Sequence, residues 1–416
     1  MTPDWRNMFV VFGRIGLLSF GGPAAQIALM HQQLVTRHRW MSEPVFLRAL
    51  SFCMLLPGPE AMQLATYAGW KQRGILGGLL AGGLFVLPGA ITITALVLAY
   101  AHYGDLPVVQ ALFVGIQASV VAIVALALVK VARKALDGPI SLGVALAAFV
   151  ALFVLALPFP VVILIAALIG ALAMPVKEIA PPIPLPPLQQ SLRVILIGGV
   201  LWALPIVLCL WLEARFLSDL ALFFSRLAVV TFGGAYAVLA YMTQTVVNEF
   251  GWITTPQMMD ALGLAETTPG PLILVTQFVG MLAGMTNGGL ITAIAAGALV
   301  LWVTFVPCFI WIFAGAPLLD WLAGQSRLQG ALAGITAAVV GVIANLSLWF
   351  AMHVFFGDVG AFSLGPFSVA WPHLPSIMWT PIALFLAALW LMRWRRINLL
   401  WTLCLCAGGA IVVHLI

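Results

Sequence analysis

Charged side chains are scarce in this chain. Of its 416 residues, only 7% are Asp, Glu, Lys or Arg, while 63% are hydrophobic. Soluble domains carry roughly 25% charged residues, so a water-soluble globule is excluded. The mean hydropathy of +1.13 instead predicts a polytopic membrane protein built from helices.

Residues typical of catalytic chemistry are also scarce. The six histidines are scattered, and the five cysteines fall inside apolar segments without metal-ligand spacing. We find no hydrolase triad, phosphate-binding loop, dinucleotide fingerprint or zinc motif. We therefore expect no enzyme, no cofactor, no metal and no ATP-driven pump. The net charge of +5 comes from Lys and Arg at segment ends, which is typical of membrane topology signals and not of nucleic-acid binding.

The fold predicted from the apolar pattern is all-α, with about thirteen membrane segments. The short stretch Met1–Asn7 leads directly into the first segment, so we expect no cleavable signal peptide. The segments fall at about 8–33, 46–70, 75–103, 108–133, 139–157, 159–175, 192–213, 219–247, 257–283, 288–314, 328–356, 376–394 and 397–415. The two short segments at 139–157 and 159–175 could also form one kinked element.

A proline-rich stretch divides the chain. Pro181-Pro182-Ile183-Pro184-Leu185-Pro186-Pro187 cannot be helical and predicts an extended linker outside the bilayer. The predicted layout is a first membrane repeat at 1–176, the linker at 177–191, a connecting helix at 192–215 and a second membrane repeat at 216–416.

The two repeats share a pair of helix-breaking motifs at one fixed spacing. Phe20-Gly21-Gly22 and Pro57-Gly58-Pro59 recur 212 positions later as Phe232-Gly233-Gly234 and Pro269-Gly270-Pro271. Between 12–64 and 224–276, about a third of the positions are identical, including paired Arg and Trp residues that apolar composition alone would not give. Broken helices at matching places of two repeats indicate the substrate site of a transporter.

The number of crossings predicts the orientation of the repeats. The second repeat begins after an odd number of segments, so the two halves are antiparallel and form an inverted-topology repeat. A cytoplasmic N-terminus and a periplasmic C-terminus place most basic residues inside. Those residues are Arg6, Lys71, Arg73, Lys130, Arg133, Lys134, Lys177, Arg327, Arg393, Arg395 and Arg396. Arg37 and Arg39 would lie on the opposite face in this topology, so we expect the first two segments to form a hairpin that does not cross fully.

The breaks themselves are the candidate substrate site. Glycine frees the backbone from its helical path, and proline suits the first turn of a new helix, so amides would lie unpaired at a positive helix end. The alternative is a simple kink or a close helix contact. The residues concerned are Gly21, Gly22, Pro23, Pro57, Gly58, Pro59, Gln63, Gly233, Gly234, Thr267, Thr268, Pro269, Gly270 and Pro271.

Four ionisable residues accompany the breaks. Arg14 and Arg226 occupy equivalent positions, and two converging guanidinium groups would favour a doubly charged oxyanion; otherwise they lie near helix ends and reach the headgroups. Glu60 and Glu266 flank the two Pro-Gly-Pro motifs and are candidates for proton coupling, or else cap helices. Gln277 and Asn345 are further polar candidates of low specificity.

At these residues the chain resembles the chromate ion transporter family in its long, two-domain form. The matching motifs are Phe-Gly-Gly-Pro at 20–23, Leu-Leu-Pro-Gly-Pro-Glu at 55–60 with Gln63, Thr-Phe-Gly-Gly-Ala-Tyr at 231–236 and Glu-Thr-Thr-Pro-Gly-Pro at 266–271. The resemblance covers both halves and is least diagnostic beyond about 356. It implies a carrier of the bacterial inner membrane that exports chromate, driven by the proton gradient, and thereby gives resistance, with sulfate as a competitor.

Other functions stay open at this point. A carrier of sulfate or another oxyanion would share the same breaks, with chromate as a mimic. An anion channel would conduct beyond the turnover of a carrier and without protons. The coupling ion, its stoichiometry and the oligomeric state are also open, with a homodimer as one alternative.

Overall fold

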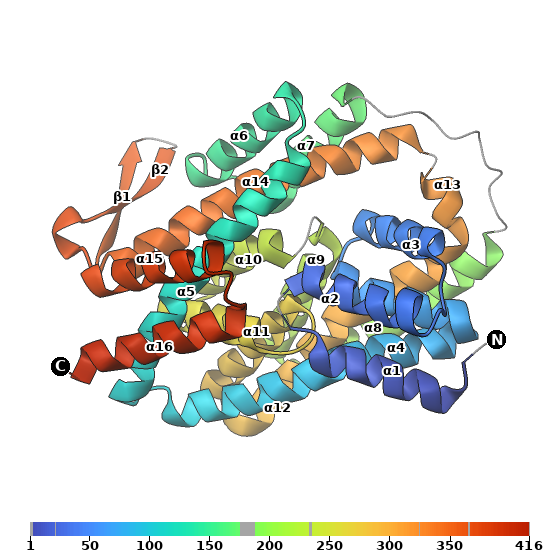
Figure 1. The fold of residues 1–416 in the computed structure, drawn as a ribbon, viewed down its shortest axis with the longest axis horizontal. Coiled ribbons are helices and arrows are strands. Elements are labelled where there is room, and N and C mark those ends of the chain that lie inside the picture. Colours follow the sequence, from blue (N-terminus) through green and yellow to red (C-terminus); the bar gives the residue numbers. More distant parts are fainter. Residues whose placement is uncertain are drawn as a thin grey trace. The chain divides into compact units, whose positions relative to one another are not determined.

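The computed structural model describes residues 3–20, 22–174, 188–232, 235–323, 325–364 and 367–415, which are mostly helical (Figure 1). The predicted linker falls on residues outside these ranges. In order, the elements are α1 (Trp5–Leu18), α2 (Gly22–His31), a π-helix (Gln32–Arg37), α3 (Glu43–Leu55), α4 (Glu60–Tyr103), α5 (Pro107–Ala135), α6 (Pro139–Phe153), α7 (Phe159–Ala173), α8 (Gln189–Trp211), α9 (Arg215–Val230), α10 (Ala235–Thr243), a second π-helix (Gln244–Glu249), α11 (Thr255–Thr267), a 3-10 turn (Leu272–Leu274), α12 (Val275–Gly315), a 3-10 turn (Ala316–Leu318), α13 (Leu319–Ala323), α14 (Ser326–Phe355), β1 (Val359–Leu364), β2 (Phe367–Pro372), a 3-10 turn (Leu374–Ser376), α15 (Trp379–Arg393) and α16 (Leu399–Leu415).

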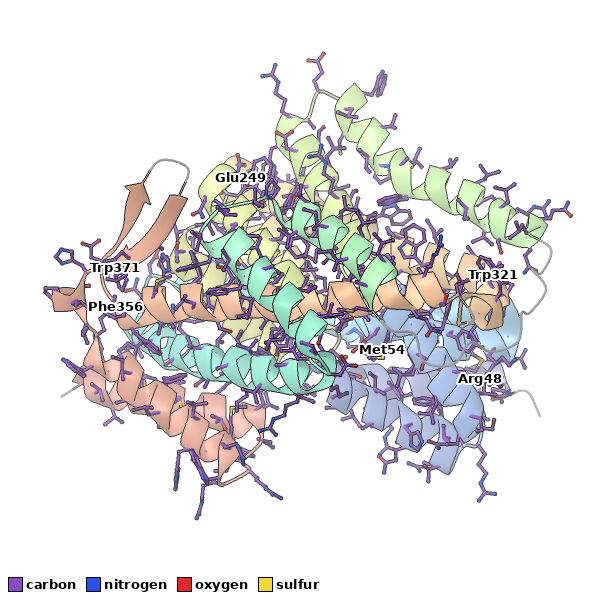
Figure 2. All side chains as sticks on the ribbon, turned by 90° about the horizontal axis from the view of Figure 1, so that it is seen from above. Arg48, Met54, Glu249, Trp321, Phe356 and Trp371 are labelled. Atoms are coloured by element: carbon purple, nitrogen blue, oxygen red, sulfur yellow. The ribbon has the colours of Figure 1, made fainter. Side chains whose placement is uncertain are left out.

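The chain forms a polytopic membrane protein. Among the described residues, five stretches are long and apolar enough to cross a bilayer, namely Glu60–Tyr103, Pro107–Ala135, Gln189–Trp211, Leu272–Leu318 and Ser326–Phe355. Large apolar side chains also cover the outside of these helices (Figure 2). On α8, none of the most apolar window is buried, as expected of a lipid-facing helix.

Two compact units make up the structure. The first contains Met1–Ala101, Glu178–Ala235 and Leu264–Gln325, and the second contains His102–Lys177, Tyr236–Gly263 and Ser326–Ile416. The predicted layout concerns repeats of sequence, whereas these units group residues by packing. The helix breaks of both repeats belong to the first unit, whose middle stretch ends at Ala235.

In the first unit, α4 and α12 each reverse direction. The backbone leaves the helical path at Arg73 and Gly74 in α4, and at Gly288 and Gly289 in α12. The stretch before each reversal folds back on the stretch after it. In α4, Gly69 packs against the carbonyl of Gly77, and in α12, Gly284 packs against Ala293. The leading stretches, 60–72 and 275–287, are about 20 Å long and too short to cross about 30 Å of hydrocarbon.

Each of the first two predicted segments folds back, so that its first and last residues lie at the same end of the first unit. Arg73 Nε donates to the carbonyl of Pro3 at 2.7 Å, and its neighbour Gln72 donates through Nε2 to the carbonyl of Trp40 at 2.8 Å. The N-terminus, the loop after the first π-helix and the turn of α4 therefore lie together. The sequence predicted one hairpin with the first two segments as its arms. In the structure, each of the two segments forms a hairpin of its own, with the helix break at its tip.

The second unit is organised around α14, along which α6 and α7 pack (Figure 1). Small residues allow close approach: Gly170 packs against Gly334, and Gly341 packs against the carbonyl of Ala145. The segments at 139–157 and 159–175 are two helices, not one kinked element. Nothing in the sequence pattern predicted the antiparallel pair β1 and β2, whose register runs from Val359 opposite Pro372 to Leu364 opposite Phe367. Figure 2 shows Trp371 at this β-hairpin.

Candidate functional site

The first break separates α1 from α2. Helix α1 ends at Leu18, and the hydroxyl of Ser19 donates back to the carbonyl of Ile15. Helix α2 begins at Gly22, whose φ of +80° is favourable only for glycine, and Pro23 follows as its second residue. The predicted site residue Gly21 lies outside the described residues.

The second break separates α3 from α4 and follows the prediction closely. Helix α3 ends at Leu55, and α4 begins at Glu60, directly after Pro59. Between them Gly58 adopts a φ of +120°, and Pro57 offers no amide that could continue the incoming helix. The amides of the first turn of α4 therefore have no carbonyl partner within the helix.

The second repeat has the same two breaks with one difference. Helix α9 ends at Val230, and the hydroxyl of Thr231 donates to the carbonyl of Leu227. Ser19, at the equivalent position of the first repeat, donates to the carbonyl of Ile15 in the same way. Gly233 and Gly234 lie outside the described residues. Gly270 has a φ of +92°, but α12 begins only at Val275, after the 3-10 turn that follows Pro271.

Hydrogen bonds join the breaks in two reciprocal pairs. The amide of Gly58 donates to the carbonyl of Thr231 at 2.7 Å, and the amide of Gly270 donates to the carbonyl of Ser19 at 2.9 Å. Each donor in one repeat is equivalent to the donor in the other, and so is each acceptor. The structure thus brings the breaks together as two pairs, and the amides of Gly58 and Gly270 are already satisfied by protein.

Helices α4 and α12 hold each pair in place. Gly89 of α4 packs against the carbonyl of Pro269, and a Cβ at Gly58 would lie 2.8 Å from Sγ of Cys308 in α12. Gly82 packs against Phe309, and Gly78 against Phe313, so these parts of α4 and α12 run in opposite directions. Because Gly82 and Gly89 are seven residues apart, the two pairs lie about 10 Å apart along α4.

Three buried glutamines surround the pairs. Gln63 Nε2 donates to the carbonyl of Pro57 at 2.7 Å, and Gln26 Nε2 donates to the carbonyl of Gly270 at 2.7 Å. Gln277 Nε2 donates to the carbonyl of Ala90 at 3.0 Å and to Thr94 Oγ1 at 2.9 Å. The sequence reasoning missed Gln26, although it follows the start of α2 by the same four positions that separate Gln63 from Pro59.

The hydroxyls near the second Pro-Gly-Pro bond back to their own helix. Thr267 Oγ1 donates to the carbonyl of Leu264 at 2.7 Å, and Thr268 Oγ1 donates to the carbonyl of Ala265 at 2.9 Å. Their protons are therefore used, and only their oxygen lone pairs remain. Glu266 is buried beside them, whereas Glu60 is half-buried at the start of α4.

The expected convergence of two arginines is not what the structure shows. Arg14 lies on the exposed face of α1, and Arg226 lies on the exposed face of α9. Arg14 is close to the loop after the first π-helix. There, burial and the guanidinium groups of Arg37 and Arg14 lower the pKa of His38 below its ordinary value. Sequence position alone could not reveal which face of each helix packs inward.

The second unit contains a separate cavity that the sequence did not indicate. Its volume is about 220 Å³, and its lining includes Gln117, Thr255, Met259 and His353. Gln117 Nε2 donates to Oδ1 of Asp260 at 2.7 Å. None of the predicted site residues lines this cavity.

Comparisons with known proteins agree on one family. The model of the family described as "Chromate transporter" matches residues 6–171 and 218–412. A "Probable chromate transport protein" of Synechococcus elongatus is 32% identical over 338 residues, covering 80% of this chain and 81% of the relative. A "Chromate transport protein" of Cupriavidus metallidurans is 30% identical over 344 residues, covering 83% of this chain and 82% of the relative. No solved structure matches the chain.

Proposed function

The chain belongs to the chromate transporter family, and from that premise we propose that it is a secondary active carrier that exports chromate across the bacterial cytoplasmic membrane and gives resistance to it. The observation that carries the proposal is the pairing of helix breaks, Gly58 with Thr231 and Gly270 with Ser19, within apolar helices. Irregular backbone at membrane depth is tolerated only where protein buries it or water reaches it. Paired breaks from two repeats are the usual setting of a carrier's substrate site.

The carrier is built from two inverted repeats in this proposal. A two-fold axis in the membrane plane would exchange Gly58 with Gly270 and Thr231 with Ser19, which accounts for the reciprocal hydrogen bonds. The opposite directions of α4 and α12 at Gly82 and Phe309 support the same axis.

The anion binds between the two pairs, and the pairs act as gates. First-turn amides of α4, such as those of Ala61 and Met62, supply a positive helix end without a charged side chain. Opening the Gly58–Thr231 pair exposes the site to one side, and opening the Gly270–Ser19 pair exposes it to the other. In this proposal the carrier is occluded when both pairs are closed.

The hairpins of the first unit support the proposed topology. Arg37 and Arg39 lie at the end of the unit that also holds Pro3 and Arg73, so they join the other basic residues on the cytoplasmic side. The N-terminus is then cytoplasmic and the C-terminus periplasmic. Arg14 and Arg226 act at the two mouths of the path, where exposed guanidinium groups raise the local concentration of the anion.

Protons drive the export, with Glu60 and Glu266 as carriers, and sulfate is a weak competitor. The test is flux of labelled chromate in proteoliposomes with and without an imposed pH gradient. We expect saturable flux that the gradient accelerates. Saturable flux that ignores the gradient removes proton coupling, and conduction without saturation indicates a channel. Absence of chromate flux under both conditions overturns the function itself.

A further inference from the structure

Six basic side chains gather at one end of the second unit. They come from the last two turns of α5 and from the turn that joins α15 to α16, and all six are exposed. We call them the basic patch: Lys130, Arg133, Lys134, Arg393, Arg395 and Arg396.

Packing of three helices brings the two parts of the basic patch to the same end. Helix α5 lies alongside α15 and α16 (Figure 1). Gly115 of α5 packs against the backbone of Cys406, whose thiol in turn donates to the carbonyl of Leu384 in α15 at 3.8 Å. Further along both helices, Ala122 belongs to the same buried cluster as Ala388. Helices α5 and α15 therefore run in the same direction, and their C-terminal ends lie together.

The helical rise gives the height of each part above this cluster. Lys130 lies about 12 Å beyond Ala122 along α5, and Arg393 lies about 8 Å beyond Ala388 along α15. Both parts thus fall within a layer as thin as the headgroup region of a bilayer.

The protein itself does not neutralise the basic patch. Among the described residues, none of the six side chains forms an ion pair or a hydrogen bond, and only Arg395 has an aromatic contact, 5.6 Å from the ring centroid of Trp390. In the turn after α5, the one carboxylate is that of Asp137, and its Oδ1 accepts from the hydroxyl of Ser141 at 3.4 Å. The patch therefore keeps a strong positive charge that an anion can balance.

The neighbours of the basic patch place it at the surface of the bilayer. Trp394 and Trp401 are 69% and 64% exposed, and tryptophan is enriched where the hydrocarbon meets the headgroups. Val129, directly before Lys130, is also exposed. Apolar surface thus lies beside exposed cations, as on a surface that contacts acyl chains and phosphate groups together.

We propose that the basic patch binds the headgroup phosphate of an anionic lipid, with cardiolipin or phosphatidylglycerol as the occupant. Arginine donates to phosphate oxygens in pairs, and the neighbouring Trp394 and Val129 contact the acyl chains. A zwitterionic lipid carries its own cation, which the patch repels, and a free anion has no chains for the apolar surface. This site is separate from the helix breaks and does not depend on what the carrier transports.

The experiment is native mass spectrometry of the full chain in detergent, titrated with cardiolipin and, separately, with phosphatidylcholine. We expect saturable binding of cardiolipin with an apparent Kd at least about tenfold lower than that of phosphatidylcholine, since each basic residue contributes to binding. Glycerol phosphate in excess is the soluble arm, and it should not displace the lipid.

Two arginines provide a matched pair of variants. Arg396 in the basic patch and Arg39 in the loop after the first π-helix both have a φ of +52°, which favours glycine. Arg396→Gly and Arg39→Gly each remove one exposed charge and relax the backbone, so both should melt at or above the wild-type temperature. We expect the Kd for cardiolipin to rise about fivefold in Arg396→Gly and to stay unchanged in Arg39→Gly. Adding Arg393→Gln to Arg396→Gly should raise it about 25-fold.

The contradicting results are distinct. An equal loss in both glycine variants would mean that general positive charge, and not this site, holds the lipid. Phosphatidylcholine binding as tightly as cardiolipin, or displacement by glycerol phosphate, would also overturn the proposal. Chromate exchange, measured in parallel in proteoliposomes of wild type, tests the carrier function by itself, so either claim can fail without the other.

Discussion

The backbone amide of Gly58 lies 2.7 Å from the carbonyl oxygen of Thr231, although 173 residues separate them in the chain. This bond joins a Pro-Gly-Pro break of one repeat to the break after α9 in the other. Its counterpart joins Gly270 to Ser19. The two sequence repeats therefore contact each other through two equivalent hydrogen bonds. The proposed function expects this arrangement, with one gate on each side of a single site.

Gly58→Ala should impair the carrier at its gate. Gly58 has a φ of +120°, and a Cβ there would lie 2.8 Å from Sγ of Cys308. The strain costs about 1–3 kcal/mol, so we expect a lower melting temperature and loss of chromate exchange. Gly83→Ala in α4 is the control, because a Cβ at Gly83 meets nothing within 4 Å. That variant should keep exchange and stability, or gain about 0.5–1 kcal/mol. Equal exchange in both variants would argue against the gate.

The thiol of Cys308 should report opening of the Gly58–Thr231 pair. It is buried in the structure. In a variant that keeps this cysteine alone, we expect N-ethylmaleimide to react slowly at rest and faster during chromate turnover. Mass spectrometry of the labelled protein measures the rate. A rate unchanged by turnover would mean that this pair does not open.

The loop after the first π-helix should be cytoplasmic. Arg37→Cys is expected to react with an impermeant maleimide only in inside-out vesicles, because the contact of Gln72 with Trp40 places this loop with the N-terminal end. Arg215→Cys, before α9, should react only from the periplasmic side. Labelling of Arg37→Cys from the periplasm would show that the first segment crosses the bilayer.

Neutralising the exposed arginines should weaken capture of the anion and not the transport step. For Arg14→Gln and Arg226→Gln, we expect a higher KM that converges with wild type at high salt, and an unchanged maximal rate. Exchange assays at several ionic strengths measure both. If either variant abolishes exchange at saturating chromate, the guanidinium groups belong to the site itself.

The charge state of His38 should depend on Arg14. Burial, Arg37 and Arg14 lower the pKa of His38, so its ring stays neutral to a lower pH than an ordinary histidine. A lowered pKa in the folded state favours folding at pH above the unfolded pKa, and this contribution disappears as pH falls through the folded value. In Arg14→Gln, the midpoint for diethylpyrocarbonate modification of His38 should therefore move to higher pH. Arg6→Gln is the control, and an unmoved midpoint in Arg14→Gln would place Arg14 away from the loop.

The sequence predicts the breaks well because glycine and proline act on the backbone locally. Helix α3 stops before Pro57, and α4 starts after Pro59, from residue chemistry alone. The pairing of Gly58 with Thr231 is a long-range contact, and no local rule identifies it. The same limit applies to Arg14 and Arg226, whose exposure depends on which helix face packs inward.

Other features lacked a distinctive pattern. The reversal at Gly74 fell between two predicted segments, so the sequence located it without revealing that the preceding stretch is too short to cross. Gln26 is one polar residue in an apolar helix, and its bond to Gly270 requires the fold. The β-hairpin from Val359 to Pro372 is apolar, like the helices around it, which hid it from the hydropathy pattern.

The most direct test of the account is equilibrium exchange of labelled chromate by wild type, Gly83→Ala and Gly89→Ala in proteoliposomes. Gly89 packs against the carbonyl of Pro269, whereas Gly83 faces open space on the same helix. The account predicts saturable exchange by wild type and Gly83→Ala, and a loss of about tenfold or more in Gly89→Ala, equivalent to about 1.4 kcal/mol in the barrier. Exchange by Gly89→Ala at the wild-type rate, or no exchange by wild type, would contradict it.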